Sequence, residues 1–118
     1  MEDEELIREM LLEILTGMGF SIVATRDGEE AFNAFIEAQN QGEPFRAMIL
    51  DLTIPGGLGG KDTIKRIRKI DQKIPVFVAS GYSEDTAVAT PELFGFSASI
   101  EKPFVISQLA EMLEKYLS

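Results

Sequence analysis

The stretch "MILDLTIPGGLGGKD", residues 48–62, decides the fold, because an apolar run ends in a single acid and then enters a glycine-rich loop. Residues 47–52 are almost continuously apolar, which is typical of a strand covered on both faces of a parallel sheet. Asp51 stands at the end of this run, and four glycines follow within residues 56–60. The pattern predicts a strand that holds a carboxylate at the rim of a sheet, followed by a loop that leaves room beside it.

Helices and strands alternate along the rest of the chain. Apolar residues at helical spacing predict helices over residues 6–18, from Asp27 to 38, and over 61–70 and 106–117, while short apolar runs predict strands over 21–25, 75–79 and 98–100. Asp27 and Glu30 form a capping-box-like pair. Residues 80–90 are expected to be short or irregular, with Thr90 as the N-cap of a helix that would begin at Pro91. This alternation indicates an α/β fold in which right-handed βαβ units build a parallel sheet between helical layers.

The composition restricts the chemistry of the protein. The 118 residues fit one domain, residues 1–118, and no apolar run approaches the roughly 20 residues that span a bilayer. The chain has no cysteine and no histidine, which excludes disulfides, thiolate metal sites and histidine-based acid–base chemistry. A bound metal must therefore accept oxygen ligands, as Mg²⁺, Mn²⁺ and Ca²⁺ do. The lack of cysteine favours a cytoplasmic setting.

Charge is unevenly distributed along the chain. The formal net charge is −9, which disfavours direct contact with nucleic acid or with an anionic membrane. Nearly half of the eleven basic residues lie in one short segment, residues 61–69. This segment has two interpretations, a solvated helix face or a docking patch for an acidic partner.

Polar residues at the ends of predicted strands form a candidate site. In open parallel sheets, ligands bind beyond the carboxyl ends of the strands. Asp51, Ser80 and Lys102 stand at three of these ends, and the acidic residues 2–5 precede the first helix. Carboxylates without histidine are suited to Mg²⁺, and a metal and a lysine together neutralise a phosphoryl group. A carboxylate held there can act as a nucleophile that forms an aspartyl phosphate, while a serine hydroxyl binds a phosphoryl oxygen.

Five pieces of the sequence together resemble the receiver domains of two-component response regulators, in particular the receivers attached to hybrid sensor histidine kinases. The pieces are "EDEELIREML", "DGEEA", "MILDLTIPGG", "VFVASGYS" and "IEKPF", in the family's order and spacing. They cover nearly the whole chain, and jointly they are specific. The resemblance implies a flavodoxin-like (βα)5 fold with strand order 2-1-3-4-5 and a cis bond between Lys102 and Pro103.

The resemblance also implies a role for each candidate residue. Asp51 corresponds to the phosphoacceptor, and Ser80 and Lys102 correspond to the residues that engage the phosphoryl group. The implied ligands of Mg²⁺ or Mn²⁺ are Glu2, Asp3, Asp51 and the Thr53 backbone carbonyl. The implied phosphoryl donor is a phosphohistidine on a histidine kinase or a histidine phosphotransfer domain.

Five features depart from the family pattern. Glu2 stands where Asp is commoner in the acidic pair, and the glycine loop is one residue longer or has Gly57 and Leu58 displaced.

The family's acidic pair ends a central first strand, whereas here it follows Met1, so this strand is expected to be absent and the sheet to have an open slot. Three explanations stay open: the chain is truncated, another chain fills the slot as in a strand-swapped homodimer, or the strand order rearranges. Ser99 takes the position of the family's aromatic switch, and Thr90-Pro91 falls within its fourth helix.

Three classes of function follow from these residues. The first is a signalling phosphoacceptor of a phosphorelay, which catalyses only its own phosphorylation and dephosphorylation and is therefore not an enzyme in the usual sense. The second is a degenerate receiver that acts only as a protein-binding module. The third is an aspartyl-phosphate phosphatase of the haloacid-dehalogenase type, but its motif requires an acid two residues after the nucleophile, where this chain has Thr53. We therefore expect the first function.

Overall fold

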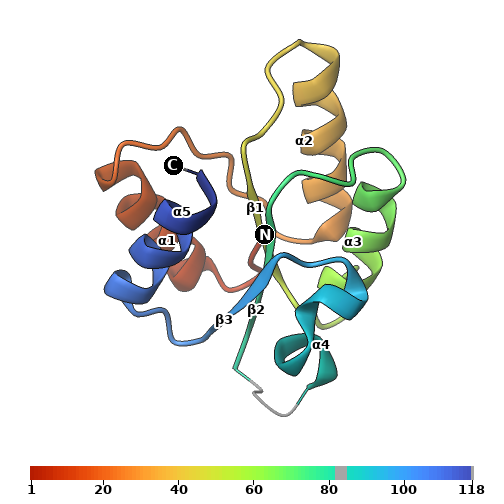
Figure 1. Ribbon diagram of the computed structural model, residues 1–118. Helices are drawn as coiled ribbons and strands as arrows, with labels where there is room; N and C mark the ends of the chain where they lie inside the picture. Colours follow the sequence, from red (N-terminus) through yellow and green to blue (C-terminus); the bar gives the residue numbers. More distant parts are fainter. Residues whose placement is uncertain (82–84, 118) are drawn as a thin grey trace.

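A parallel three-stranded sheet lies between two layers of helices (Figure 1) in the computed structural model, which describes residues 1–81 and 85–117. The strands are β1 (Met48–Asp51), β2 (Val76–Ser80) and β3 (Ala98–Glu101), and their spatial order is β1-β2-β3. This order matches the last three strands of the expected flavodoxin-like arrangement. The Lys102–Pro103 bond is cis, as the resemblance implies.

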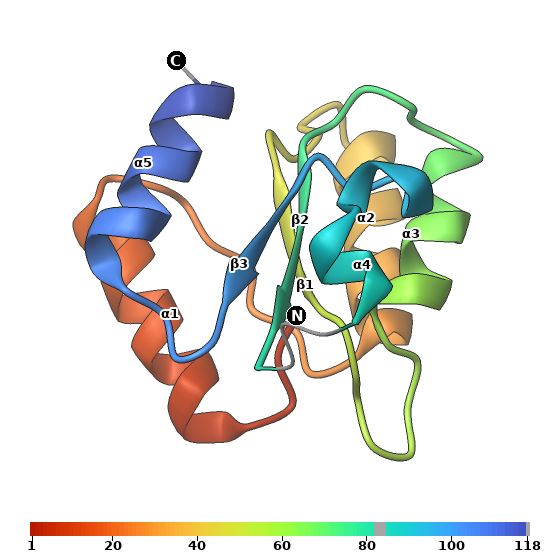
Figure 2. The same cartoon turned by 60° about the horizontal axis from the view of Figure 1, so that its bottom comes forward.

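The two helical layers cover opposite faces of the sheet (Figure 2). The first layer consists of α1 (Glu5–Gly17) and α5 (Ile106–Leu117). The second layer consists of α2 (Gly28–Asn40), α3 (Gly60–Arg68) and the short α4 (Thr86–Ala89), which the 3-10 helix η1 (Pro91–Phe94) follows. Within the described ranges, no helix combines the length and the apolar character that crossing a membrane requires.

Strand β2 is the centre of the core, because every one of its residues is buried. Phe77 and Ala79 pack with α1 and α5, whereas Val76 and Val78 pack with α2 and α3. The Phe77 ring meets the ring of Tyr116 edge-on, with centroids 5.2 Å apart. Burial on both faces explains why the sequence of this strand is continuously apolar rather than alternating.

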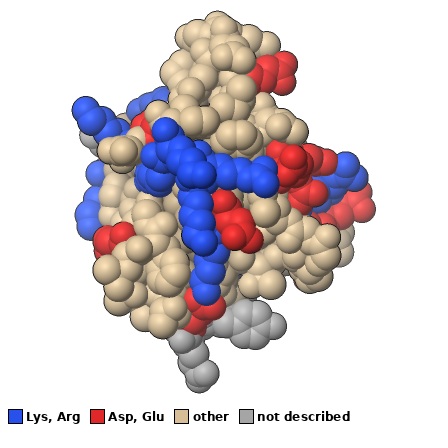
Figure 3. Space-filling view, turned by 90° about the vertical axis from the view of Figure 1, so that its right-hand side faces the viewer, with Lys and Arg blue, Asp and Glu red and all other residues tan. Residues whose placement is uncertain are grey.

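The basic segment lies on α3, and Figure 3 shows Lys and Arg side chains gathered on this side of the molecule. Three of its side chains contact neighbouring elements. Lys61 forms an ion pair with Asp85 at 3.3 Å, and Arg66 forms one with Glu29 at 3.0 Å. The Arg68 guanidinium donates a hydrogen bond to the Gly95 carbonyl oxygen, 2.8 Å away. These contacts tie α3 to its neighbours and favour the interpretation as a solvated helix face.

Glycines 59 and 60 allow α3 to begin directly against the end of β1. The Gly60 amide donates to the Leu52 carbonyl oxygen at 3.1 Å. A Cβ atom on Gly59 would lie 2.5 Å from that same oxygen, and one on Gly60 would lie 2.9 Å from the Asp51 carbonyl oxygen. At these two positions the glycines are explained by close backbone approach, in addition to any room that the loop leaves beside Asp51.

The capping pair at the start of α2 differs from the expectation in one bond. The Asp27 carboxylate accepts a hydrogen bond from the Glu30 amide at 2.9 Å, which is the predicted N-cap. The Glu30 carboxylate, however, accepts from the Arg26 amide rather than from the Asp27 amide, and it also pairs with the Arg26 guanidinium. The reciprocal half of the capping box is therefore displaced by one residue.

The predicted strand over residues 21–25 is wrong. These residues lie within the described part of the chain, but they run as an irregular segment between α1 and α2. The reason is the open slot beside β1, since a strand needs a neighbour to pair with. The expected slot is confirmed: a cavity of ≈ 520 Å³ lies between residues 20–25 and β1. At one end of this cavity, the Glu2 amide donates a hydrogen bond to the Thr25 carbonyl oxygen, at 3.0 Å.

The region after β2 is short and irregular, as expected. Helix α4 has four residues, and Pro91 begins the four-residue η1 rather than a longer helix. Thr90 precedes Pro91, but its side chain donates to the Thr86 carbonyl oxygen at 2.8 Å and makes no capping bond. Residues 82–84 lie outside the described residues.

Candidate functional site

The polar residues predicted at the strand ends gather at one rim of the sheet. Asp51 is the last residue of β1, Ser80 is the last residue of β2, and Lys102 follows β3 directly. The register pairs Asp51 with Ala79 and Ser80 with Glu101, so the parallel strands end at the same level. Asp51 and Ser80 are both buried, with 6% and 3% of their surfaces exposed. Parallel topology thus brings residues that lie far apart in the sequence into one place.

One ammonium group joins two buried carboxylates at this rim. The Lys102 Nζ atom lies 2.6 Å from Glu2 Oε1 and 3.0 Å from Asp51 Oδ2. The side chains of Glu2 and Asp51 are 3% and 8% exposed, and that of Lys102 is 17% exposed. The Glu4 amide donates a further hydrogen bond to Glu2 Oε2 at 3.1 Å. Each buried charge therefore has a partner of opposite charge, which is the condition for burying it at an acceptable cost.

The carboxylates of Glu2, Asp3 and Asp51 could hold a metal ion. One oxygen of each residue lies within 4.8 Å of the corresponding oxygens of the other two. Glu2 and Asp51 are buried, whereas Asp3 is exposed. Three carboxylates exceed the single charge of Lys102, so the group retains negative charge. Oxygen ligands with excess negative charge suit a hard divalent cation such as Mg²⁺.

The two buried carboxyls differ in their pKa values. Burial raises the pKa of Asp51 above the ordinary value of an aspartate, and the hydrogen bond from Lys102 only partly offsets this effect. Burial also acts to raise the pKa of Glu2, but hydrogen bonds from Lys102 and from the Glu4 amide outweigh it and lower the pKa. The two carboxylates raise the pKa of Lys102 against the effect of its own burial. Asp51 is thus the carboxyl whose charge is compensated least.

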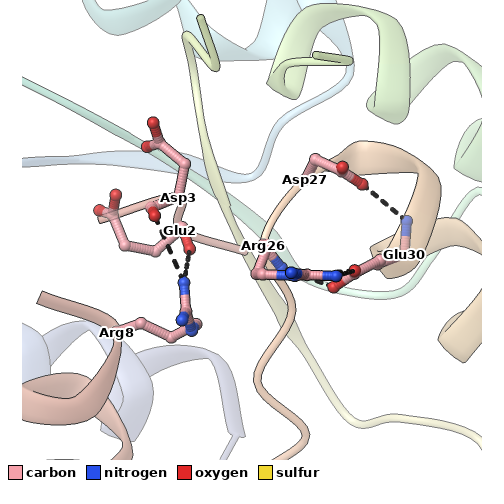
Figure 4. Close-up of polar contacts among 6 residues, drawn as sticks. All are labelled: Glu2, Asp3, Arg8, Arg26, Asp27 and Glu30. Atoms are coloured by element: carbon pink, nitrogen blue, oxygen red, sulfur yellow. Dashed lines mark hydrogen bonds and ion pairs between the residues drawn. The ribbon is translucent and has the colours of Figure 1, made fainter. Parts of the chain in front are cut away.

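A short backbone ladder and Arg8 hold the acidic residues in place. The Met1 carbonyl oxygen accepts from the Asp51 amide at 3.1 Å, and the Glu2 amide donates to Thr25. The Arg8 guanidinium donates to the Glu2 carbonyl oxygen at 3.0 Å and to that of Asp3 at 3.4 Å (Figure 4). The side chains of Glu2 and Asp3 are therefore left to face the site. Sequence reasoning missed Arg8, whose only signal is that it is the lone basic residue within an acidic helix.

Thr53 and Ser99 are two further positions that the sequence analysis singled out. Thr53 lies in the exposed loop two residues after Asp51, and the role expected for its carbonyl stays a prediction. Ser99, at the position of the expected aromatic switch, donates its hydroxyl hydrogen to the Val88 carbonyl oxygen at 2.9 Å. It therefore links β3 to α4 through a hydrogen bond rather than through an aromatic ring.

Comparison with known proteins identifies this arrangement. The sequence model of the response regulator receiver domain matches residues 1–114. Response regulator RR06 of Streptococcus pneumoniae is 31% identical over 117 residues, which cover 96% of this chain and 49% of RR06. This chain therefore spans about half the length of RR06. Chemotaxis protein CheY of Thermotoga maritima is 30% identical over 115 residues, which cover 97% of this chain and 91% of CheY.

A solved structure agrees with the sequence comparison. The crystal structure of the receiver domain of NtrX from Brucella abortus superposes with a TM-score of 0.82 and 28% sequence identity. The match covers 98% of this chain and 93% of that receiver. The strand order, the acid at the end of β1 and the lysine after β3 lie within the matched region. The chain belongs to the family of response regulator receiver domains.

Proposed function

We propose that residues 1–118 form one receiver domain that accepts a phosphoryl group on Asp51 in a two-component phosphorelay. Receiver domains are signalling phosphoacceptors of response regulators rather than conventional enzymes, and they interact with histidine kinases or phosphotransfer proteins. The observation that carries the proposal is the group of Glu2, Asp3 and Asp51, which lie together at the strand ends beside Lys102.

The proposed reaction is an in-line transfer. A carboxylate oxygen of Asp51 forms a bond to phosphorus, while the bond between phosphorus and the nitrogen of the donor phosphohistidine breaks and that nitrogen keeps the electron pair. Burial raises the pKa of Asp51, which makes its carboxylate a stronger base than that of an exposed aspartate. The product is an aspartyl phosphate, so the chain is both the acceptor and the scaffold of the reaction.

A divalent cation, Mg²⁺ or Mn²⁺, would supply positive charge that neutralises the phosphoryl oxygens. Glu2, Asp3, Asp51 and the Thr53 carbonyl are the proposed ligands, with Glu2 acting in part through water. Lys102 already contacts Glu2 and Asp51, and we assign it to the phosphoryl oxygens of the product. The Ser80 hydroxyl is assigned to a second phosphoryl oxygen, because Ser80 ends the strand next to β1.

The test is incubation with acetyl phosphate and Mg²⁺, followed by measurement of the intact mass. We expect one added phosphoryl group on the native chain, and none on an Asp51→Asn variant or after removal of divalent cations with a chelator. Glu111→Gln, on the exposed side of α5, is the matched control and should be labelled as the native chain is. Equal labelling of the Asp51→Asn variant would contradict the assignment.

A protein-binding module without phosphotransfer is the second candidate function. One observation favours it: Lys102 forms ion pairs with both Glu2 and Asp51, so each of these carboxylates has a cationic partner within the protein itself. Titration with Mg²⁺ distinguishes the two, because a phosphoacceptor requires saturable Mg²⁺ binding that Asp51→Asn weakens. A chain that binds no Mg²⁺ and takes up no phosphoryl group would be the binding module.

A further inference from the structure

Arg8 lies in the first turn of α1, and its side chain reaches back to the segment that precedes the helix. One guanidinium nitrogen, Nη1, donates to the Glu2 carbonyl oxygen at 3.0 Å and to the Asp3 carbonyl oxygen at 3.4 Å. Figure 4 shows the Asp3 carboxylate pointing away from Arg8. A single cation therefore bridges the backbone of two consecutive residues whose side chains are proposed ligands of the metal.

The positive charge of Arg8 is placed on backbone oxygens rather than on carboxylates. Among the described residues, Glu2 and Asp51 form their ion pairs with Lys102, and Arg8 forms no ion pair. A hydrogen bond from a cationic donor to a carbonyl oxygen is stronger than one between two neutral groups. Arg8 thus holds the backbone that carries the acids and leaves their carboxylate oxygens to other partners.

Helix α1 connects Arg8 to the core of the protein. Leu11 and Leu15 are buried on this helix and belong to the same apolar cluster as Phe77 of β2. They lie three and seven positions after Arg8, so all three side chains leave the same side of the helix. The guanidinium is therefore carried by an element that packs on β2, the strand beside the one that ends in Asp51.

The acids need such an anchor, because three carboxylates bind one cation only when their oxygens are held close together. One oxygen each of Glu2, Asp3 and Asp51 lies within 4.8 Å of the others. Asp51 is fixed by its place in β1, whereas Glu2 and Asp3 belong to an irregular segment ahead of α1. Like charges repel, and a segment that must be ordered during binding lowers the affinity for the ligand.

We propose that Arg8 is a positioning residue for the divalent cation. By binding the carbonyl oxygens of Glu2 and Asp3, it keeps their carboxylates within reach of the cation that Asp51 also binds. The inference rests on the proposed function, since it assumes that these three acids hold Mg²⁺. Groups that hold metal ligands in place typically contribute about 10–100-fold to metal affinity. Arg8 acts through the two acids and contacts neither the cation nor the phosphoryl group.

The charge of Arg8 and its hydrogen bonds have opposite effects on cation binding. A guanidinium near the site repels Mg²⁺, so removal of its charge alone would strengthen the binding of Mg²⁺. Removal of its hydrogen bonds releases the segment that carries Glu2 and Asp3, which weakens the binding of Mg²⁺. The direction in which the affinity changes therefore separates positioning from simple electrostatic repulsion.

The test is calorimetric titration of the native chain and its variants with Mg²⁺, after circular dichroism has checked that each variant is folded. Arg8→Met should raise the Kd for Mg²⁺ about tenfold or more. Arg8→Lys keeps the charge without the planar fork of donors and should fall in between. Arg46→Met is the matched control, because the Arg46 guanidinium also donates to a backbone carbonyl, that of Leu117 at 2.7 Å, and its Kd should equal the native one. Equal or tighter binding by Arg8→Met, or no binding by the native chain, would overturn the proposal.

Hydrogen exchange without metal tests the same role independently of Mg²⁺. The Glu2 amide donates to the Thr25 carbonyl oxygen, and the Glu4 amide donates to the Glu2 carboxylate. Both amides should exchange faster in Arg8→Met than in the native chain or in Arg46→Met, while the amides of β2 should exchange as in the native chain. Unchanged exchange at Glu2 and Glu4 would show that Arg8 does not hold this segment, and the proposal would fail.

Phosphorylation with acetyl phosphate separates this inference from the proposed function. For Arg8→Met, the Mg²⁺ concentration that half-saturates the labelling rate should rise by the same factor as the Kd, whereas the rate at saturating Mg²⁺ should stay near the native one. An unchanged half-saturating concentration would contradict the role of Arg8 and leave phosphotransfer to Asp51 standing. A native chain that binds Mg²⁺ more tightly than Arg8→Met but takes up no phosphoryl group would support Arg8 as a positioning residue and contradict the proposed function.

Discussion

At the scale of single residues, the site depends on how one lysine is shared. Lys102 contacts two carboxylates that are almost fully buried, and among the described residues neither carboxylate forms an ion pair with a second cationic side chain. The pKa of Asp51 is raised and that of Glu2 is lowered, so Lys102 and the Glu4 amide compensate Glu2 more completely. A divalent cation would correct this imbalance by lowering the pKa of Asp51.

Replacing Lys102 should expose this dependence. Lys102→Met leaves two buried carboxylates without a cation, which should lower the free energy of unfolding by about 3 kcal/mol at pH 7. Loss of the ammonium raises the pKa of both carboxyls in the folded state, and a raised carboxyl pKa destabilises the fold above the ordinary pKa. The decrease in the free energy of unfolding caused by Lys102→Met should therefore become smaller as the pH falls towards 5 and the carboxyls gain protons.

Urea unfolding at pH 7 and pH 5 measures this effect. Lys65→Met is the control, because Lys65 is exposed on α3, and its unfolding free energy should stay within about 0.5 kcal/mol of the native value at both pH values. A Lys102→Met chain as stable as the native one at pH 7 would show that the two carboxylates do not need the ammonium.

Asp71 offers a separate test of a carboxylate in a turn. Its Oδ1 atom accepts from the Lys73 amide at 2.8 Å and from the Ile74 amide at 3.0 Å. These bonds lower its pKa, the bond from Lys73 most, below the ordinary value of 3.8. Its charge therefore stabilises the fold above that value, and this contribution is lost as the pH falls through the folded pKa.

Asp71→Asn keeps an acceptor oxygen but removes the charge. We expect a loss of about 1 kcal/mol in the free energy of unfolding at pH 7, because bonds to charged acceptors are the stronger ones. Chemical unfolding of both chains at pH 7 and pH 3 checks this, and the difference should be smaller at pH 3. A difference that grows on acidification would have the wrong sign for this mechanism.

Residues of the site were predictable to different degrees. Asp51, Ser80 and Lys102 follow from sequence, because parallel strands end at a common rim and each residue stands at such an end. Arg8 was not predictable, since its guanidinium binds two backbone carbonyls whose positions depend on how residues 1–3 enter the site. Unlike the local cap at Asp27, a side-chain contact to the backbone carbonyls of an irregular segment carries no sequence pattern of its own.

At the scale of elements, a strand is a property of two segments rather than of one. Residues 98–100 and 21–25 are both short apolar runs, but only the first becomes a strand. Strand β3 pairs along its length with β2, whereas residues 21–25 face the slot. Helices α1 and α5 were predicted within a residue or two, because a helix closes its own hydrogen bonds and needs only one apolar face.

Two glycine-to-alanine changes should act in opposite directions. Gly59→Ala places a Cβ 2.5 Å from the Leu52 carbonyl oxygen, so α3 must move away from β1, at a cost of roughly 1–3 kcal/mol. Gly17→Ala adds a Cβ that meets nothing within 4 Å at the end of α1, and it should stabilise the protein by roughly 0.5–1 kcal/mol. Thermal unfolding of both variants measures the signs, and a stabilised Gly59→Ala would contradict the close approach of α3.

At the scale of the whole molecule, stability should fall from the middle of the sheet towards the slot. Strand β2 is buried throughout and pairs with a neighbour on each side. Strand β1 pairs along its length only with β2, and on its other side it meets Met1 alone. Residues 20–25 have one backbone bond to Glu2 and another through the Phe20 amide to Leu15. Each step towards the slot removes a row of hydrogen bonds and part of the apolar cover.

Native-state hydrogen exchange should reveal this gradient. The amides of Val78 and Ala79 should exchange only through global unfolding, because both faces and both edges of β2 are covered. The Ile49 amide, which points into the slot, should exchange much faster than its neighbour Leu50, although the two are adjacent in one strand. That contrast is the most direct measurement, because the two residues are adjacent in one strand and their amides face opposite edges of β1. If Ile49 were as protected as Leu50 in the isolated monomer, the segment of residues 20–25 would have closed onto β1, and the gradient would be absent.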